Sequence, residues 1–176
     1  GFSSAASDVY KRQILENLSH QISLRPGQLF RVGTGEHSDS LALDHYLRIS
    51  PHLIQFFSNL PNAVLELKTK SDHVDHLLDL PHGGKTVIAW SLNPEIVIEQ
   101  EEHKTARLEE RLQAARKASD AGYKLAFHFD PMLHFPGWEK EYPRLVKRLF
   151  DSVSPERIAW ISMGTLRCLP MLKPIV

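Results

Sequence analysis

The sequence predicts an α/β fold with a parallel sheet, and two observations support that prediction. Apolar runs such as Thr86–Trp90 are unbroken by polar residues, which is typical of strands buried on both faces. Five such runs alternate with helical segments at about the 30-residue spacing of a βα unit. Because every run ends in polar residues, we expect one active edge, and five strands form only part of a barrel.

The five predicted strands are runs of β-branched and large apolar residues bounded by turn-forming residues. The first ends in a glycine-rich turn, the second follows Asn62, and the fourth stops at Asp130-Pro131. In chain order they are Leu29–Val32, Ala63–Lys68, Thr86–Trp90, Lys124–Phe129 and Arg157–Ile161.

The predicted helices rest on apolar residues spaced three or four apart and on capping residues. Ser50 before Pro51 predicts one helix start, with Pro at the first helical position. Thr105 is expected to cap a longer helix that ends before Gly122. The remaining predicted helical segments are Gln13 to about Ile22, one after Asp44, Val74 to Leu78, a turn from Pro94, and Trp138 to Leu149.

Composition places the 176-residue chain among ordinary globular proteins, with 42% hydrophobic and 24% charged residues. Basic and acidic residues balance at 21 each, so no overall positive charge demands a nucleic acid, although a local basic patch stays open. No stretch is long and apolar enough to span a membrane. The single cysteine excludes an internal disulfide, and we expect a cytoplasmic protein.

The first twelve residues differ from the rest because they hold few core-forming side chains. We expect residues 1–12 to be an extraneous or disordered leader and residues 13–176 to form one domain. The chain also stops directly after an apolar segment, at Pro174 to Val176. Both ends lead us to expect a fragment of a longer protein.

Polar side chains at the ends of the predicted strands form the candidate site. The carboxyl ends of parallel strands meet at one edge of a sheet, so these side chains should converge on one crevice. A lysine there suits a carboxylate, and serine suits ribose hydroxyls. The candidates are Glu36, Lys70, Ser91, Asp130 and Ser162.

Two glycines after the first predicted strand add to this site. Gly33 and Gly35 flank a threonine and allow a ligand to approach the backbone closely. They are not a dinucleotide-binding fingerprint, because the third glycine of G-x-G-x-x-G would fall on Ser38.

Histidines offer an alternative site of a different class. Alternation along the fourth strand places His128 and Asp130 on one face, and His73 and His76 follow the second strand. Such groups can ligate zinc or manganese, so a metal-dependent barrel hydrolase is a second hypothesis.

Five segments together resemble the spore photoproduct lyase family of radical S-adenosylmethionine (SAM) proteins. The resemblance runs from about Leu29 to the end of the chain, and the segments occur in the family's order and spacing. They are Arg31–Glu36 with the residues up to Asp44, Leu65–Ser71, Val87–Pro94, Phe127–Pro131 and Trp160–Arg167.

The resemblance implies a partial (β/α)6 TIM-like barrel that uses a [4Fe–4S] cluster and an electron donor to cleave S-adenosylmethionine. In the family, the resulting radical reverses a thymine photoproduct, so DNA is the implied substrate. By position, Lys70 matches the lysine for the methionine carboxylate, and Ser91 matches the ribose-contacting serine. Asp130 matches another cofactor-lining position, and Gly33–Glu36 lies near the methionine moiety.

Two departures limit what the chain itself is expected to do. A cluster of this type needs three cysteine thiolates, whereas Cys168 is the only cysteine. The family's hydrogen-donor cysteine aligns within Glu36–Asp39, where this chain has none. We therefore expect an inactive fragment whose longer parent carries the cluster. A non-catalytic S-adenosylmethionine-binding module is the third hypothesis, and neither a catalytic residue nor a metal ligand is assigned.

Overall fold

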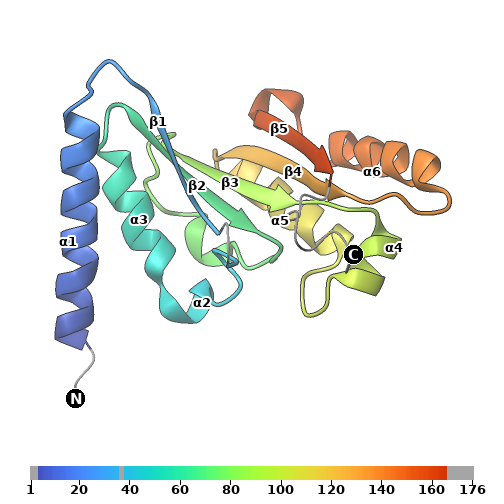
Figure 1. Ribbon diagram of the computed structural model, residues 1–176, viewed down its shortest axis with the longest axis horizontal. Coiled ribbons are helices and arrows are strands. Elements are labelled where there is room, and N and C mark those ends of the chain that lie inside the picture. The colour runs from blue at the N-terminus through green and yellow to red at the C-terminus, as the bar shows by residue number, and fades with distance from the viewer. Residues whose placement is uncertain (1–3, 36–37, 166–176) are drawn as a thin grey trace, which may run out of the picture.

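Five parallel strands form one curled sheet in the order β1-β2-β3-β4-β5 (Figure 1). The computed structural model describes residues 4–35 and 38–165. Within them no helix is long and apolar enough to cross a bilayer. The strands are β1 (Phe30–Thr34), β2 (Ala63–Thr69), β3 (Thr86–Ser91), β4 (Lys124–Met132) and β5 (Ile158–Thr165). The helices are α1 (Ser4–Ser23), α2 (Asp44–Leu47), α3 (Ile49–Ser58), α4 (Glu95–Glu101), α5 (Leu108–Asp120) and α6 (Trp138–Ser152), with short 3₁₀ turns at Asp75–Leu77 and Pro155–Arg157.

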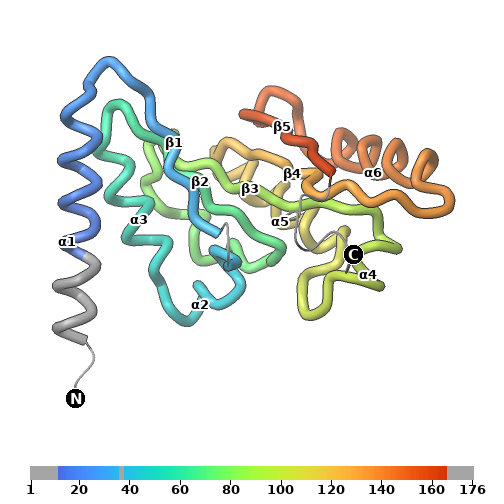
Figure 2. The backbone as a smooth tube through the Cα atoms, in the orientation of Figure 1, coloured from blue at the N-terminus to red at the C-terminus, as the bar shows by residue number. Residues whose placement is uncertain are grey.

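The helices cover one face of the sheet, which is its convex face (Figure 2). Helix α3 packs on β2 and β3, and α5 packs on β3 and β4. Alternate strand residues point into this layer and form the main core, including the fully buried Leu67, Trp90 and Phe127. The Trp90 indole also donates a hydrogen bond of 3.0 Å to the carbonyl of Ser71, which ties β3 to the loop after β2.

The opposite, concave face has apolar residues at one end and polar residues at the other. Near the amino ends of the strands, a small second cluster contains Val87, Ala89 and Ala126, with Trp160 packed against it. Towards the carboxyl ends, the same face carries charged and hydroxyl side chains, beginning with Glu66. The sheet therefore separates a packed helical layer from a polar inner surface, as the inner face of a barrel requires.

Several predicted boundaries shift. The helix predicted from Gln13 begins at Ser4, so part of the predicted leader is helical. Strand β5 runs on to Thr165, which places Ser162 within the strand and not at its end. Helix α5 begins at Leu108, three residues after the predicted cap Thr105, whose hydroxyl bonds to the Glu102 carbonyl instead.

The start of α3 shows why one cap prediction was wrong. Ser50 is the second residue of the helix, and the residue before the helix, Arg48, adopts a left-handed conformation with φ of 52°. Asp44 takes the capping role, because its Oδ1 accepts hydrogen bonds from the backbone N–H groups of Ile49 and Ser50. The other oxygen of Asp44 accepts a 2.8 Å hydrogen bond from His76. A side chain five residues before the first helical residue therefore caps the helix terminus.

Candidate functional site

Four of the predicted site residues line one pocket at the carboxyl ends of β2, β3 and β4. We call this hollow of about 240 Å³ the Lys70 pocket. It joins the loop after β1 to the ends of three neighbouring strands, as the parallel topology predicts. Its lining residues are Gly35, Ser38, Asp39, Lys68, Thr69, Lys70, Ser91 and Asp130.

Lys70 is the first residue after β2, and the fold holds both its backbone and its side chain. Its N–H donates a 2.6 Å hydrogen bond to Asp39, and its carbonyl accepts one of 3.0 Å from Ala106. The ammonium lies 3.0 Å from Oε1 of Glu102, while the side chain remains 37% exposed. A cation fixed in this way, but still reachable from the pocket, suits an anionic group of a ligand.

Asp39 organises the pocket wall, and the sequence-based prediction did not include it. Its Oδ1 accepts hydrogen bonds from the N–H groups of Leu41 and Ala42 and from the hydroxyl of Thr69. Together with the bond to Lys70, this carboxylate joins the loop after β1 to the end of β2. The bond from the N–H of Leu41 to Asp39 forms an Asx turn. Asp is favoured at the first position of such turns, so its residue type was the signal in the sequence.

Gly35 is required where it stands. Its φ is +88°, and an added Cβ would lie 2.6 Å from the carbonyl oxygen of Lys68 and 2.6 Å from the hydroxyl of Ser40. Gly33, in contrast, lies inside β1 opposite Glu66 and lines a neighbouring pocket. Glu36 lies outside the described residues.

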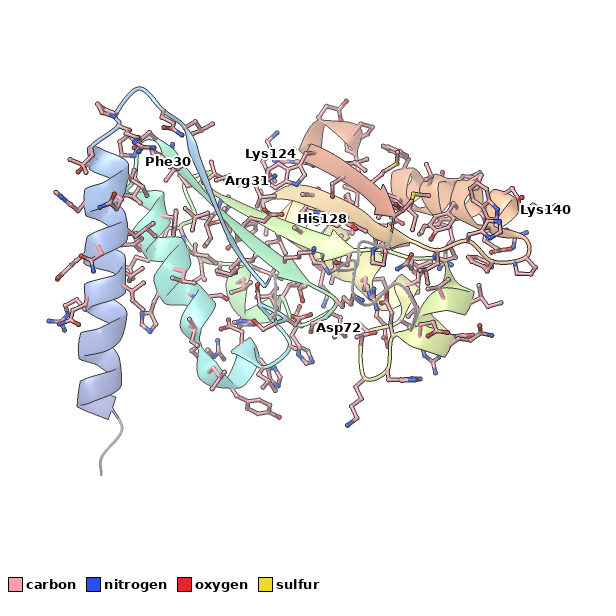
Figure 3. All side chains as sticks on the ribbon, viewed as in Figure 1. Phe30, Arg31, Asp72, Lys124, His128 and Lys140 are labelled. Atoms are coloured by element: carbon pink, nitrogen blue, oxygen red, sulfur yellow. The ribbon has the colours of Figure 1, made fainter. Side chains whose placement is uncertain are left out.

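The neighbouring pocket, which we call the inner-face pocket, has a volume of about 320 Å³ and shares Lys68 with the Lys70 pocket. Its centre is a hydrogen-bonded chain in which Nε2 of His128 lies 2.7 Å from Glu66 and Nδ1 lies 2.5 Å from the hydroxyl of Ser162. The lining residues are Arg31, Gly33, Thr34, Glu66, Lys68 and His128, of which Arg31 and His128 are labelled in Figure 3.

The charge on Glu66 is maintained by its partners. Burial acts to raise the pKa of this carboxyl, but the hydrogen bond from His128 and the charges of His128, Arg31 and Lys68 outweigh it and lower the pKa. Glu66 is therefore ionised near neutral pH. Arg31 also lies over the ring of Trp160, 5.0 Å from its centroid, so the guanidinium is held between a carboxylate and an aromatic face.

The metal-hydrolase hypothesis finds no support in the described part of the chain. Both ring nitrogens of His128 are already hydrogen-bonded, one to a carboxylate and one to a hydroxyl. Residues 4–35 and 38–165 contain no group of three or more His, Cys, Asp or Glu side chains arranged to hold a metal ion.

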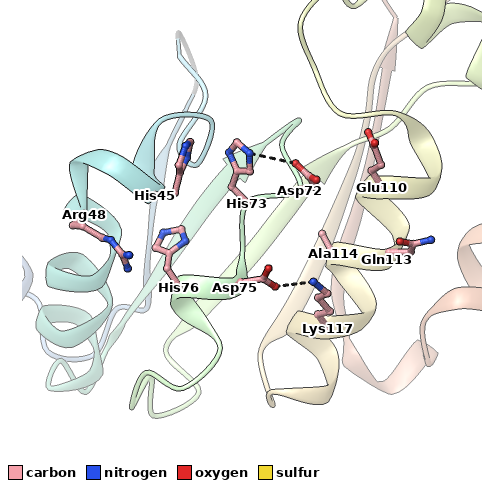
Figure 4. Close-up of a pocket in the computed structure, with 10 residues that line it drawn as sticks. All are labelled: His45, Arg48, Asp72, His73, Asp75, His76, Glu110, Gln113, Ala114 and Lys117. Atoms are coloured by element: carbon pink, nitrogen blue, oxygen red, sulfur yellow. Dashed lines mark hydrogen bonds and ion pairs between the residues drawn. The ribbon is translucent and has the colours of Figure 1, made fainter.

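His73 and His76 belong to a separate hollow of about 470 Å³ on the helical side, which we call the histidine pocket (Figure 4). The rings of His45 and His73 meet edge to face with centroids 4.1 Å apart, and Lys117 pairs with Asp75 at 2.7 Å. Loss of solvent contact and the neighbouring His73 lower the pKa of His45. His76 pairs with Asp44 outside the pocket, and Nδ1 of His45 is buried with no hydrogen-bond partner among the described residues. The histidine pocket shares no lining residue with the Lys70 pocket.

Comparison with known proteins places these features in a family context. The family model described as spore photoproduct lyase matches residues 7–166. The spore photoproduct lyase of Geobacillus sp. (strain Y412MC61) is 38% identical over 128 residues, which cover 73% of this chain and 38% of that protein. The enzyme of Bacillus subtilis (strain 168) is 34% identical, over 83% of this chain and 42% of its own length.

Solved structures agree with the sequence comparison. A variant of spore photoproduct lyase with bound AdoMet and dinucleoside spore photoproduct matches with a TM-score of 0.83 and 31% identity, over 92% of this chain and 48% of that one. A complex of the enzyme with dinucleoside spore photoproduct gives the same values. This likeness confirms the predicted partial barrel. The chain spans about two fifths of the length of the curated relatives named above.

Proposed function

The chain belongs to the spore photoproduct lyase family, and we propose that its Lys70 pocket binds S-adenosylmethionine within a radical enzyme that acts on a DNA photoproduct. The observation that carries the proposal is the convergence of Gly35, Lys70, Ser91 and Asp130 on one pocket at the strand ends. In this proposal Lys70 holds the carboxylate of the methionine part, and Ser91 contacts the ribose. The chemistry that the cofactor supplies when bound is radical abstraction of a hydrogen atom.

The residues of the pocket fit such a ligand. S-adenosylmethionine carries a carboxylate and an ammonium, and the pocket offers both a cation, Lys70, and an anion, Asp130. Ser91 provides a hydroxyl that can donate or accept a hydrogen bond. The backbone at Gly35 leaves the space that a side chain would otherwise fill. These are groups that bind and orient a ligand, and we assign none of them to the bond-breaking step.

The residues of this chain do not fit an iron–sulfur cluster. A site-differentiated cluster needs three thiolates, and the sequence contains one cysteine, which lies outside the described residues. We propose that the cluster, and an electron donor for it, belong to a longer parent protein in the cytoplasm, with residues 13–176 forming the cofactor-binding part of its barrel.

The substrate proposal rests on the relatives. Their structures contain a dinucleoside spore photoproduct, so we propose a DNA photoproduct of that chemical class as the substrate of the parent protein. The absence of a cysteine in residues 36–39 leaves no thiol there to return a hydrogen atom to the product. A related lyase reaction, with a different hydrogen donor, is therefore part of the proposal.

Calorimetric titration with S-adenosylmethionine tests the pocket directly. We expect Lys70→Met to weaken binding about tenfold, or about 1.4 kcal/mol, because the carboxylate loses its cation. Lys117→Met is the matched control, since that lysine is also ion-paired but lies in the histidine pocket. Equal affinities of the unsubstituted chain and Lys70→Met for S-adenosylmethionine would contradict the assignment. If the longer protein, loaded with its cluster, binds S-adenosylmethionine without cleaving it, the pocket belongs to a non-catalytic binding module.

A further inference from the structure

A buried ion-pair network lies directly behind the Lys70 pocket. Glu102, whose side chain is 6% exposed, accepts hydrogen bonds or ion pairs from three groups: Lys70 at 3.0 Å, Asn93 at 3.1 Å and Arg111 at 2.6 Å. Glu102 does not line the Lys70 pocket itself. Its direct contact with a lining residue of the pocket is the ion pair with Lys70.

Arg111 connects this network to the other end of the pocket. Its side chain is fully buried, and its guanidinium donates to the carbonyl of Ser91 at 2.8 Å and to the hydroxyl of Thr105 at 2.7 Å. A further hydrogen bond of 2.8 Å runs from its Nε to the carbonyl of Ala106. One arginine thus fixes the last residue of β3 and the loop that carries Glu102.

Glu102 is ionised, so the network contains two cations and one anion. Burial acts to raise the pKa of Glu102, but the charge of Arg111, the hydrogen bonds from Asn93 and Arg111 and the charge of Lys70 outweigh it and lower the pKa. Glu102 is therefore an anion between two cations. The formal charges of Lys70, Glu102 and Arg111 add up to one positive charge, so Glu102 can hold Lys70 without cancelling its attraction for an anionic ligand.

We propose that Glu102 and Arg111 are positioning residues of the S-adenosylmethionine pocket. Glu102 holds the ammonium of Lys70 in place, and Arg111 fixes Glu102 and the Ser91 backbone relative to each other. A lysine that is already ordered loses less conformational freedom when a carboxylate binds, which is how preorganised sites gain affinity. This inference rests on the proposed function of the pocket.

The hydrogen-bonding chain continues beyond Glu102 into the helical layer. The hydroxyl of Tyr142 donates to Asn93 Oδ1 at 3.0 Å and accepts from the N–H of Leu133 at 2.8 Å. Asn93 is therefore oriented so that its amide N–H groups point at Glu102. Asn93 and Arg111 therefore hold the carboxylate with which Lys70 pairs.

A double-mutant cycle separates positioning from a general structural role. In the otherwise unsubstituted chain, we expect Glu102→Gln to weaken S-adenosylmethionine binding at least fivefold by calorimetry. In the Lys70→Met background, the same substitution should change the affinity less than twofold, because no ammonium is left to position. Equal weakening in both backgrounds would show a structural role and overturn the proposal, as would no weakening in the parent.

Three further variants control this experiment. Glu102→Asp retains the charge and should bind more tightly than Glu102→Gln, and it replaces the latter if that protein does not fold. Arg111→Lys retains the charge but loses the hydrogen-bonding fork, so its affinity should also fall. Glu109→Gln, on the exposed surface of α5, should bind as the parent does.

A ligand-free measurement keeps the two proposals distinguishable. The motion of the Lys70 side chain, followed by NMR relaxation of its methylene groups, should increase in Glu102→Gln. If the parent does not bind S-adenosylmethionine, the proposed function of this pocket fails, and the NMR result alone decides whether Glu102 positions Lys70. Unchanged motion in Glu102→Gln would overturn the inference whatever the calorimetry shows.

Discussion

The imidazole Nε2 of His128 lies 2.7 Å from Oε1 of Glu66, across the concave face of the sheet. Both side chains are nearly buried, at 11% and 8% exposure. The pair joins β2 to β4 over the intervening strand β3, and Ser162 extends it to β5. These side chains are therefore structural ties across the barrel interior as well as walls of the inner-face pocket.

Replacing only one residue of this pair should lower the free energy of unfolding more than replacing both. We expect His128→Leu to lower the free energy of unfolding by about 3 kcal/mol, because the buried Glu66 carboxylate loses its hydrogen-bonded partner and keeps only the charges of Arg31 and Lys68. Adding Glu66→Leu should restore part of the loss, with a coupling energy of about 1–3 kcal/mol. Urea denaturation of the parent, both single variants and the double variant gives this energy, and strict additivity would contradict the prediction.

Acid should destabilise the fold through Glu102. Its folded-state pKa lies below its ordinary value of 4.5, so the group adds stability that is present above the unfolded-state pKa and lost as the pH falls through the folded-state pKa. Chemical denaturation between neutral pH and pH values below about 4 should therefore show a falling free energy of unfolding.

The Glu102→Gln variant should show a flatter pH dependence over the same window, because it has no carboxyl to protonate. Glu99→Gln, on the exposed part of α4, should keep the slope of the parent. A Glu102→Gln slope equal to that of the parent would assign the acid sensitivity to other carboxyls, such as Glu66.

The sheet and the pocket could be predicted from the sequence because both follow from local patterns. Unbroken apolar runs predicted the strands, and the polar residues after them predicted a site at the carboxyl ends. Lys70, Ser91 and Asp130 do line one pocket. Their roles towards a cofactor remain predictions.

The supporting residues could not be predicted, because their partners are distant in the chain. From the sequence, Glu102 and Arg111 resemble ordinary exposed charged residues of a loop and a helix. In the structure, Arg111 is fully buried and donates a hydrogen bond to the carbonyl of Ser91. Glu66 and Lys68 alternate with Leu65 and Leu67 along β2, so that period of two did contain a signal for a polar inner face.

Tyr123 should ionise only at high pH. Burial raises the pKa of its hydroxyl to about 12, and the hydroxyl donates a 2.7 Å hydrogen bond to the Leu77 carbonyl. Because the folded-state pKa is raised, the stabilisation is complete below the unfolded-state pKa of about 10 and is lost as the pH rises towards 12. An ultraviolet tyrosinate titration of Tyr123→Phe should lack the corresponding step, and a retained step would contradict the prediction.

Gly35→Ala should damage the Lys70 pocket more than its backbone angle alone explains. The φ of +88° disfavours any side chain, and the new Cβ would also meet the Lys68 carbonyl oxygen at 2.6 Å. We expect a loss of about 2–4 kcal/mol in the free energy of unfolding. Gly84→Ala is the matched control, because Gly84 has a φ of +70° with nothing within 4 Å of an added Cβ, and it should lose about 1–2 kcal/mol. Equal losses in thermal or urea denaturation would show that the close approach of Lys68 contributes nothing, and that the loop after β1 can move away from the end of β2.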